Sequence, residues 1–132
     1  MLPPDGHDTP RPGRPVRGSR TGQPLNALFD LLGRRWTLTV VWTLRDGAMT
    51  FRELQAEAGG VAASVLNTRL RELRAARLVA AGDDGYALTA LGHALLAAGA
   101  PLIAWADDWA SALDENGAAE DPRTVAPENG AR

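Results

Sequence analysis

The sequence predicts a mostly α-helical domain with one small β-hairpin, and three observations support this fold class. The chain has 132 residues, close to the usual size of one domain. Its 24 Ala and 18 Leu far outnumber its two Phe and one Tyr, which favours helices packed through small and medium side chains. Apolar residues recur at helical spacing along most of the chain, and an Asp-Gly pair between two short apolar runs indicates the hairpin.

Charge is distributed unevenly along the chain, although the net charge is only −2. Residues 1–24 carry +2, residues 25–82 carry +3 and residues 83–132 carry −7. A basic middle region can bind a polyanion even in a weakly acidic protein, because local potential governs association. Arginine-rich helices beside acidic ends are also typical of an ordinary solvated surface, so charge alone leaves both interpretations open.

The composition excludes several classes of site. The chain has no Cys, which excludes disulfides, thiolate metal sites and thiol redox sensing. Its longest uninterrupted apolar runs are far shorter than the roughly 20 residues that cross a bilayer, and the N-terminus has no apolar signal-peptide core. We therefore expect a cytoplasmic protein without a membrane segment, a metal or a cofactor.

Composition divides the chain into three parts. Residues 1–24 hold six Pro and four Gly with few apolar side chains, so we expect a disordered tail there. The folded body is expected over residues 25–114, and an acidic flexible tail over residues 115–132. Arginines recur at every third position of the first part, which fits either an arm for a DNA groove or an unselected tail; they are Arg11, Arg14, Arg17 and Arg20.

Three helices are expected in the first half of the body. Leucines at helical spacing predict a short helix over residues 25–32 that ends at Gly33. Residues 36–44 are apolar on nearly all sides, including Trp36 and Trp42, and predict a buried central helix. Thr50 and Glu53 have the form of a capping box, which predicts a two-turn helix ending before two glycines.

The second half predicts a longer helix, the hairpin and a final helix. Residues 62–76 place Leu66, Leu70 and Leu73 on one face and polar or arginine side chains on the other. Two short strands are expected within residues 78–88, on either side of a Gly-Asp-Asp-Gly turn. Thr89 is expected to cap a last helical region, which Gly99 and Pro101 should kink or break. Its apolar seam is Leu91, Leu95, Ala98, Leu102, Trp105 and Trp109.

This order of elements is that of a winged helix-turn-helix, in which a short helix braces a second one that can enter the DNA major groove. The residues that carry the order resemble the HxlR-type helix-turn-helix transcriptional regulators, relatives of the MarR group. They are LFDLLGRRWTLTVVWTLRDGAMTFRELQ, then VLNTRLRELRAARLV and YALTALGHALL, within residues 25–109. The resemblance implies a sequence-specific DNA-binding regulator.

The resemblance further implies a homodimer on a pseudo-palindromic operator, with residues 62–76 as the recognition helix and the terminal helices as the dimer contact. The DNA-binding residues expected from it are Arg52, Ser64, Asn67, Thr68, Arg69, Arg71 and Arg74. Asn67 suits adenine, Arg71 suits guanine or phosphate, and Arg69 and Arg74 suit the backbone. The dimer residues expected from it are Leu25, Leu28, Leu102, Trp105 and Trp109.

The sequence departs from the family pattern in three places. Ala62 and Ala63 stand where relatives commonly place a Ser cap, which is worth about 1 kcal/mol. The hairpin turn is short and carries Asp83 and Asp84 where relatives carry basic residues, so its contact with DNA is doubtful. The redox-sensing Cys of many relatives is absent, and the oxidant-sensor role does not transfer.

Two other functions were weighed against DNA binding. A winged-helix protein-interaction or dimerisation module without DNA binding is the alternative, and the acidic turn and acidic C-terminus favour it. Nothing in the sequence predicts an enzyme, because His7 falls in the expected tail and His93 stands alone on a helix. Trp105 and Trp109 share one helical face, which fits dimer packing or an aromatic pocket for a flat apolar effector.

Overall fold

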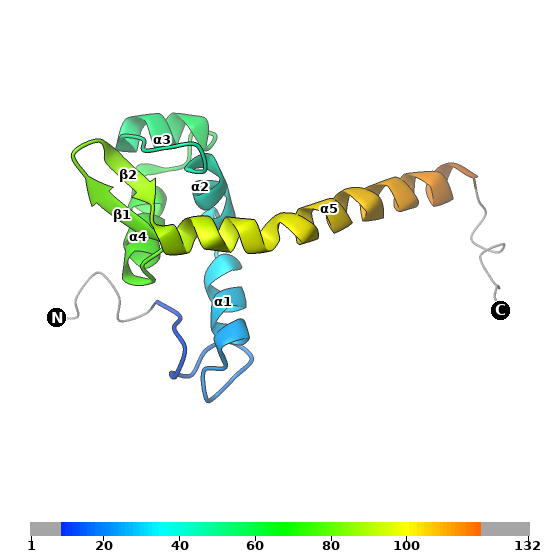
Figure 1. Cartoon of the computed structure of the whole chain (residues 1–132), viewed down its shortest axis with the longest axis horizontal. Coiled ribbons are helices and arrows are strands. Elements are labelled where there is room, and N and C mark those ends of the chain that lie inside the picture. The colour runs from blue at the N-terminus through cyan, green and yellow to red at the C-terminus, as the bar shows by residue number, and fades with distance from the viewer. Residues whose placement is uncertain (1–8, 120–132) are drawn as a thin grey trace. The chain divides into compact units, whose positions relative to one another are not determined.

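The computed structural model describes residues 9–119, with side chains described as far as residue 115. By its contacts the chain forms one compact unit that ends at Leu96 and a second that begins at Ala97. The elements in chain order are α1 (Pro24–Leu32), α2 (Thr37–Thr43), α3 (Phe51–Glu57), α4 (Ala63–Ala75), β1 (Val79–Gly82), β2 (Gly85–Leu88) and α5 (Ala90–Ala119) (Figure 1). The expected fold class, mostly helical with one antiparallel hairpin, is confirmed.

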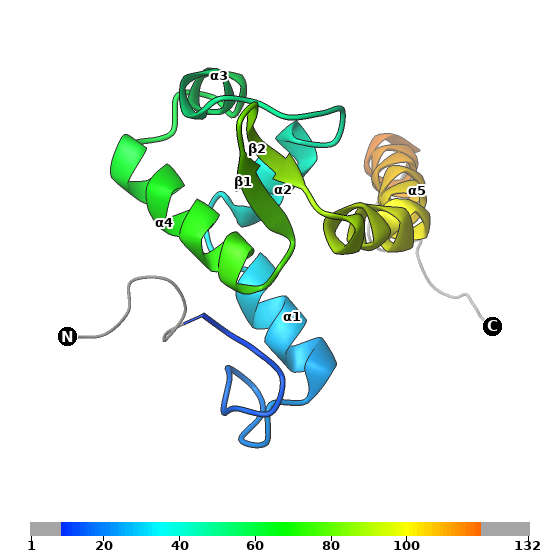
Figure 2. The ribbon, with the colours of Figure 1, turned by 60° about the vertical axis from the view of Figure 1, so that its left-hand side comes forward.

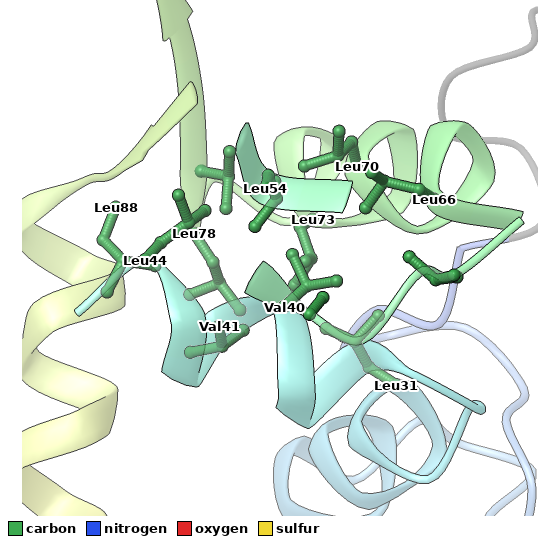
Figure 3. Close-up of a cluster of buried hydrophobic side chains, with 13 residues drawn as sticks. Leu31, Val40, Val41, Leu44, Leu54, Leu66, Leu70, Leu73, Leu78 and Leu88 are labelled. Atoms are coloured by element: carbon green, nitrogen blue, oxygen red, sulfur yellow. The ribbon is translucent and has the colours of Figure 1, made fainter. Parts of the chain in front are cut away.

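One apolar core joins the elements of the first unit (Figure 3). The three leucines expected on the inner face of α4 are all buried, and they meet Val40, Val41 and Leu44 of the α2 region. Truncating a buried leucine of this kind costs about 2–5 kcal/mol, so these contacts fix where α4 lies. The core residues come from α1, α2, α3, α4 and the hairpin, and include Leu31, Leu54, Leu66, Leu70, Leu73, Leu78 and Leu88.

The turn between α1 and α2 differs from the expected one in its backbone. α1 ends before Gly33 as predicted, but Gly33 has a right-handed φ of −77° and makes no left-handed cap. The left-handed conformation falls instead on Trp36, with φ 77°, immediately before α2. A bulky residue in this region costs about 1–3 kcal/mol. Packing of the Trp36 ring against the core offsets that cost.

Helix α2 is less buried than its composition predicted. Val40 and Val41 are fully buried, but Leu38 is 56% exposed and Trp42 is 47% exposed, so the interpretation of Trp42 as a core anchor is wrong. The guanidinium of Arg45 lies 4.2 Å from the centroid of the Trp42 ring, a cation–π contact at the surface. The helix Thr37–Thr43 has only one side toward the core. Because its residues are apolar on nearly all sides, the sequence pattern does not show which side is exposed.

Helices α3 and α4 begin as the sequence predicts. The Thr50 hydroxyl accepts a hydrogen bond from the Glu53 backbone N–H at 3.2 Å, and the Glu53 carboxylate accepts one from the Thr50 N–H at 2.9 Å. This is the expected capping box, and α3 ends before Gly59 and Gly60. α4 starts after Ala62 without any side-chain cap, as the missing serine predicts.

The hairpin has the expected turn and pairs Val79 with Leu88 in antiparallel register. An additional bridge that sequence patterning did not indicate joins Met49 to Tyr86, so the chain before α3 lies along β2. Thr89 caps α5, because its hydroxyl accepts a hydrogen bond from the Gly92 N–H at 3.0 Å. The same hydroxyl donates to the Arg77 carbonyl at 2.7 Å, which ties the start of α5 to the end of α4.

Helix α5 is longer than predicted. It continues through Gly99 and Pro101 without a break and extends to Ala119, five residues beyond the expected end of the folded body. Leu95 packs against the core, whereas Leu102, Trp105 and Trp109 are exposed. The remainder of the expected acidic tail, residues 120–132, lies outside the described residues.

Within the described residues, the stretch Ala90–Glu115 is long and apolar enough to cross a bilayer by length and composition alone. Uninterrupted apolar runs did not indicate this stretch, because its many alanines raise the mean hydropathy although no run is long. Asp107 and Asp108 lie inside the stretch, and a carboxylate near the centre of a bilayer costs roughly 2.5–3.5 kcal/mol. That cost disfavours a membrane span and favours a helix that contacts another protein surface.

Residues 9–23 contain neither helix nor strand, but the structure describes them as a series of turns. Thr9 is buried, and the Arg17 backbone N–H donates to the Asp30 carboxylate of α1 at 3.1 Å. The Gly13 N–H donates to the Gly22 carbonyl at 3.0 Å, which closes a loop between them. Residues 1–8, the remainder of the expected tail, lie outside the described residues.

Candidate nucleic-acid interface

The outer face of α4 carries most of the residues expected to bind DNA. Ser64, Asn67 and Arg74 are exposed, and Thr68 and Arg71 are partly exposed on the same face. Figure 2 shows α4 at the edge of the first unit, beside α3 and the hairpin. The spacing 64, 67, 68, 71 and 74 places these side chains along one stripe, opposite the buried leucines. A stripe of this kind presents hydrogen-bond donors and acceptors together with two guanidinium groups.

Hydrogen bonds organise the middle of this stripe. The Thr68 hydroxyl donates to the Ser64 carbonyl at 3.0 Å, and the Arg71 guanidinium lies 3.5 Å from the same hydroxyl. The Arg71 guanidinium therefore lies beside the Thr68 hydroxyl on the exposed face of α4. A long side chain that is already partly ordered loses less entropy on binding.

Arg52 lies apart from the stripe, near the start of α3. It is exposed, and α3 is the short helix that braces α4 in this fold. This placement fits contact with a phosphate rather than with the base edges that face α4. The structure therefore brings five of the seven expected residues onto one face of α4 and places Arg52 on α3, outside that face.

Arg69, the remaining expected DNA residue, turns away from the stripe. Its guanidinium donates to the Glu72 carboxylate at 2.5 Å and to the Arg35 backbone carbonyl at 2.8 Å. Arg34 donates to the other oxygen of Glu72 at 2.6 Å. Glu72 is 8% exposed, so one buried carboxylate joins α4 to the turn between α1 and α2. Arg69 holds the recognition helix in place in this geometry.

Sequence reasoning missed the part played by Glu72 and Arg34. One signal was available, because Glu72 follows Arg69 by three residues on a helix and such pairs lie side by side. The same rule does not reveal Arg34, which lies 38 residues away in the chain. That partner could be found only from the packing of α1 against α4.

The hairpin turn offers no positive charge to DNA. Asp83 and Asp84 are both exposed at the turn, and residues 79–88 contain no arginine. Carboxylates near phosphates repel them, so the hairpin cannot replace the basic wing of other winged helices. The arginines of the described first unit lie instead in residues 9–23, on α3 and α4, and in the turns before and after α2 and after α4.

No cluster of catalytic or metal-binding groups appears in the part of the chain that the structure describes. No group of three or more His, Asp or Glu side chains there could hold a metal ion. His93 is exposed on α5, and His7 lies outside the described residues.

The residues expected at a dimer contact are largely exposed. Leu25 and Leu28 lie on α1, the first exposed and the second partly buried. On α5, Leu102, Trp105 and Trp109 are 69%, 59% and 53% exposed, and the two indole rings stack with centroids 5.7 Å apart. Leu113 continues the same face and is also exposed. Large apolar side chains exposed along one helix mark an interaction surface.

Helix α4 is braced by α3, carries an outward stripe of polar and arginine side chains and is followed by a hairpin. This arrangement defines a DNA-binding protein of the winged helix-turn-helix class. Comparison with known proteins gives the family. The HxlR-like helix-turn-helix family matches residues 31–114, and the chain belongs to this family. It is a DNA-binding transcriptional regulator.

Named relatives agree with this assignment. The chain is 30% identical over 87 residues to the uncharacterized HTH-type transcriptional regulator YvaP of Bacillus subtilis, and the matched region covers 61% of this chain and 81% of YvaP. It is 30% identical over 92 residues to the HTH-type transcriptional regulator YodB of the same organism, covering 64% and 82%. The crystal structure of quinone-bound YodB has a TM-score of 0.61 and 33% identity, and the match covers 64% of this chain and 96% of that one.

We predict that Glu72→Gln destabilises the fold by about 3 kcal/mol. Removing one partner of a buried ion pair leaves the others uncompensated, and the partial exposure of both guanidiniums places the cost at the lower end of the usual range. The midpoint of urea unfolding measures the change. Glu57→Gln, an exposed acid on α3, is the matched control and should change stability by less than about 0.5 kcal/mol. Equal midpoints for the two variants would contradict the assigned geometry.

Proposed function

We propose that this regulator recognises DNA through the outer stripe of α4, with Asn67 and Arg71 at base edges and Arg52 and Arg74 at phosphates. The observation that carries this proposal is the Arg71 side chain, oriented by Thr68 on the exposed face of α4. Bidentate pairing of Asn with adenine and of Arg with guanine are the common specific contacts in a major groove. Ser64 and Thr68 lie in the N-terminal half of the helix, the part that contacts base edges in helix-turn-helix proteins.

We infer that Arg69 contributes to DNA binding by fixing the position of α4 and that it makes no phosphate contact. Its guanidinium is occupied by Glu72 and by the Arg35 carbonyl, and its side chain is only 19% exposed. Moving it to DNA would leave the Glu72 carboxylate with one fewer partner in a buried setting, which is costly. The proposed contact set is therefore smaller than the sequence expected.

We propose that the protein acts as a homodimer in the cytoplasm, on an operator whose half-sites lie about one helical turn, roughly 10 bp, apart. The apolar face of α5 supports a second copy as its occupant, because its leucines and stacked tryptophans lie on one side. In a two-fold dimer the same face meets itself, which suits a continuous apolar stripe. We propose no catalytic role.

A small, flat, apolar effector is a further part of the proposal. YodB, a relative of this chain, has been solved in a quinone-bound form. The stacked Trp105 and Trp109 rings offer an aromatic surface of the kind that binds planar molecules. This chain has neither cysteine nor lysine, the side chains that add readily to quinones, so the proposed binding is noncovalent.

We expect Arg71→Ala to weaken binding to promoter DNA by about 1–3 kcal/mol, because a guanidinium that pairs with a base edge is lost. Fluorescence anisotropy with a labelled duplex, selected from random DNA with the purified protein, measures the affinity. Arg45→Ala is the control, since it removes an arginine at the end of α2 instead of on α4. An Arg71→Ala protein that binds as tightly as the control would remove Arg71 from the interface. Undetectable binding by the unmodified chain at low salt would favour an interaction module without DNA binding.

We expect the double variant Trp105→Ala, Trp109→Ala to shift the protein from dimer to monomer at micromolar concentration. Two large aromatic side chains in the centre of an interface typically dominate its energy, at about 2 kcal/mol or more each. Sedimentation velocity measures the mass. Asp107→Ala, on the opposite face of α5, should remain dimeric. A dimer of unchanged strength in the tryptophan variant would exclude this face as the contact.

Titration with benzoquinone should quench the tryptophan fluorescence of the protein in a saturable way, and dialysis should reverse the effect. Collisional quenching of N-acetyltryptophanamide by the same quinone rises without saturation and serves as the control. The double tryptophan variant, which retains Trp36 and Trp42, should lose the saturable part. Saturable quenching that survives in this variant would place the effector elsewhere, and its absence across several planar compounds would refute the effector proposal.

A further inference from the structure

A second basic surface lies beside α4, on residues 9–23, which we name the arginine segment. It contains four arginines and no acidic residue, and all four are exposed. Among the described residues no acidic side chain forms an ion pair with Arg11, Arg14, Arg17 or Arg20. Residues 1–30 precede the part of the chain that the HxlR-like family matches, so the family pattern does not account for this segment.

Backbone hydrogen bonds hold the arginine segment in shape. Val16 and Ser19 exchange two of them, at 2.8 and 3.0 Å, and Gly13 donates to Gly22. Gly22 is required there, because a Cβ would lie 2.3 Å from the Arg14 carbonyl oxygen and φ is +73°. The arginine side chains take no part in these bonds. Their heads therefore remain available to an external anion, and they can be substituted without loss of the loop.

Contacts place the arginine segment next to the recognition helix. A hollow of about 330 Å³ is lined by Pro10, Arg11 and Pro12 on one side and by α1 and residues 75–78, at the end of α4, on the other. A second, more open hollow of about 610 Å³ is lined by Arg11, Arg14, Arg17 and Arg34 together with Asp30. Arg34 bonds to Glu72 of α4, so this groove adjoins the recognition helix. Figure 2 shows the segment, in blue, passing the C-terminal end of α4 on its way to α1.

A helix seated in a major groove lies between two phosphate backbones, because the groove is about 12 Å wide. Under the proposed function, Arg52 of α3 contacts one of them. The basic wing that serves other members of this class is replaced here by two aspartates. The arginine-lined groove adjoins the other side of α4, where Glu72 and Arg69 lie. Charge and position together favour DNA phosphate over an acidic protein as the occupant.

We propose that Arg11, Arg14 and Arg17 bind phosphates of the DNA backbone alongside the groove that receives α4. This inference rests on the proposed function, in which α4 enters the major groove. The contacts supply affinity without base specificity, since phosphates are the same at every position. The arginine segment thereby provides the positive charge that the hairpin lacks.

The test is the salt dependence of DNA binding by the full chain with Arg11, Arg14 and Arg17 all changed to Gln. Each lost phosphate contact should reduce the slope of log affinity against log salt by about 0.9, so the triple variant should lose about 2.7 in slope and bind at least about tenfold more weakly at 50 mM salt. The ratio between selected and scrambled duplexes should stay unchanged. Arg14→Gln should lose about 0.9 in slope, whereas the matched control Arg20→Gln, in the same segment but outside the groove, should lose none.

A second variant, with the same three positions changed to Lys, distinguishes an effect of lost charge from an effect of altered structure. Lysine binds phosphate as a point charge, so this variant should keep the slope of the unmodified protein. A triple Gln variant with unchanged slope would overturn the inference, and so would a Lys variant as weak as the Gln variant. A change in base preference would overturn it as well. Arg71→Ala, measured in parallel, distinguishes the outcomes, because its effect tests the α4 interface independently of the arginine segment.

Discussion

The orientation of the recognition helix depends on one buried carboxylate. Glu72 accepts hydrogen bonds from Arg34, in the turn after α1, and from Arg69 on its own helix. Arg69 also donates to the Arg35 carbonyl, so two contacts, Arg34 to Glu72 and Arg69 to Arg35, join α4 to this turn. Leucines beneath α4 fix its depth in the core, but apolar contacts are not directional. Hydrogen bonds to a buried charge are directional, and they limit rotation of α4 about its axis.

This constraint explains why the turn between α1 and α2 accepts an unfavourable backbone. Trp36 takes a left-handed φ of 77° directly after the two arginines that serve α4. With Trp36 in that conformation, the Arg35 carbonyl accepts the hydrogen bond from Arg69 of α4 while the Trp36 ring packs against the core. The guanidinium of Arg35 lies 5.8 Å from the centroid of the same ring. The strained backbone of Trp36 therefore lies directly after the residues that hold α4 in place.

Sequence patterns predicted the elements because each depends on local rules. Leucines at helical spacing gave α4, the Thr50–Glu53 pair gave the start of α3, and the Asp-rich turn gave the hairpin. Spacing also assigned Ser64, Asn67 and Arg71 to one face of α4. It failed for Arg69, which donates to the carbonyl of Arg35, 34 residues away, as well as to its helix neighbour Glu72.

The remaining wrong predictions concern residues whose surroundings are set by other parts of the molecule. Gly99 and Pro101 were expected to kink or break α5, and the break does not occur, because the helix continues on both sides of the proline, which removes one backbone donor. Leu38 and Trp42 were assigned to the core from composition, although a helix of seven residues can bury only part of its surface. Whether an apolar side chain is covered depends on neighbours that lie far away in the sequence or in another chain.

The exposed apolar side chains connect the fold with the way it reads DNA. A regulator that reads two half-sites must hold two copies of α4 at a fixed separation, because half-sites repeat with the turn of the duplex. A single chain does not set that separation, and in the proposed homodimer it comes from the contact between copies. The leucines and stacked tryptophans of α5 are suited to this contact, since they are apolar, lie on one face and are uncovered in the single chain. A planar ligand between the tryptophans would then change the separation directly, which gives a simple route from ligand binding to DNA affinity.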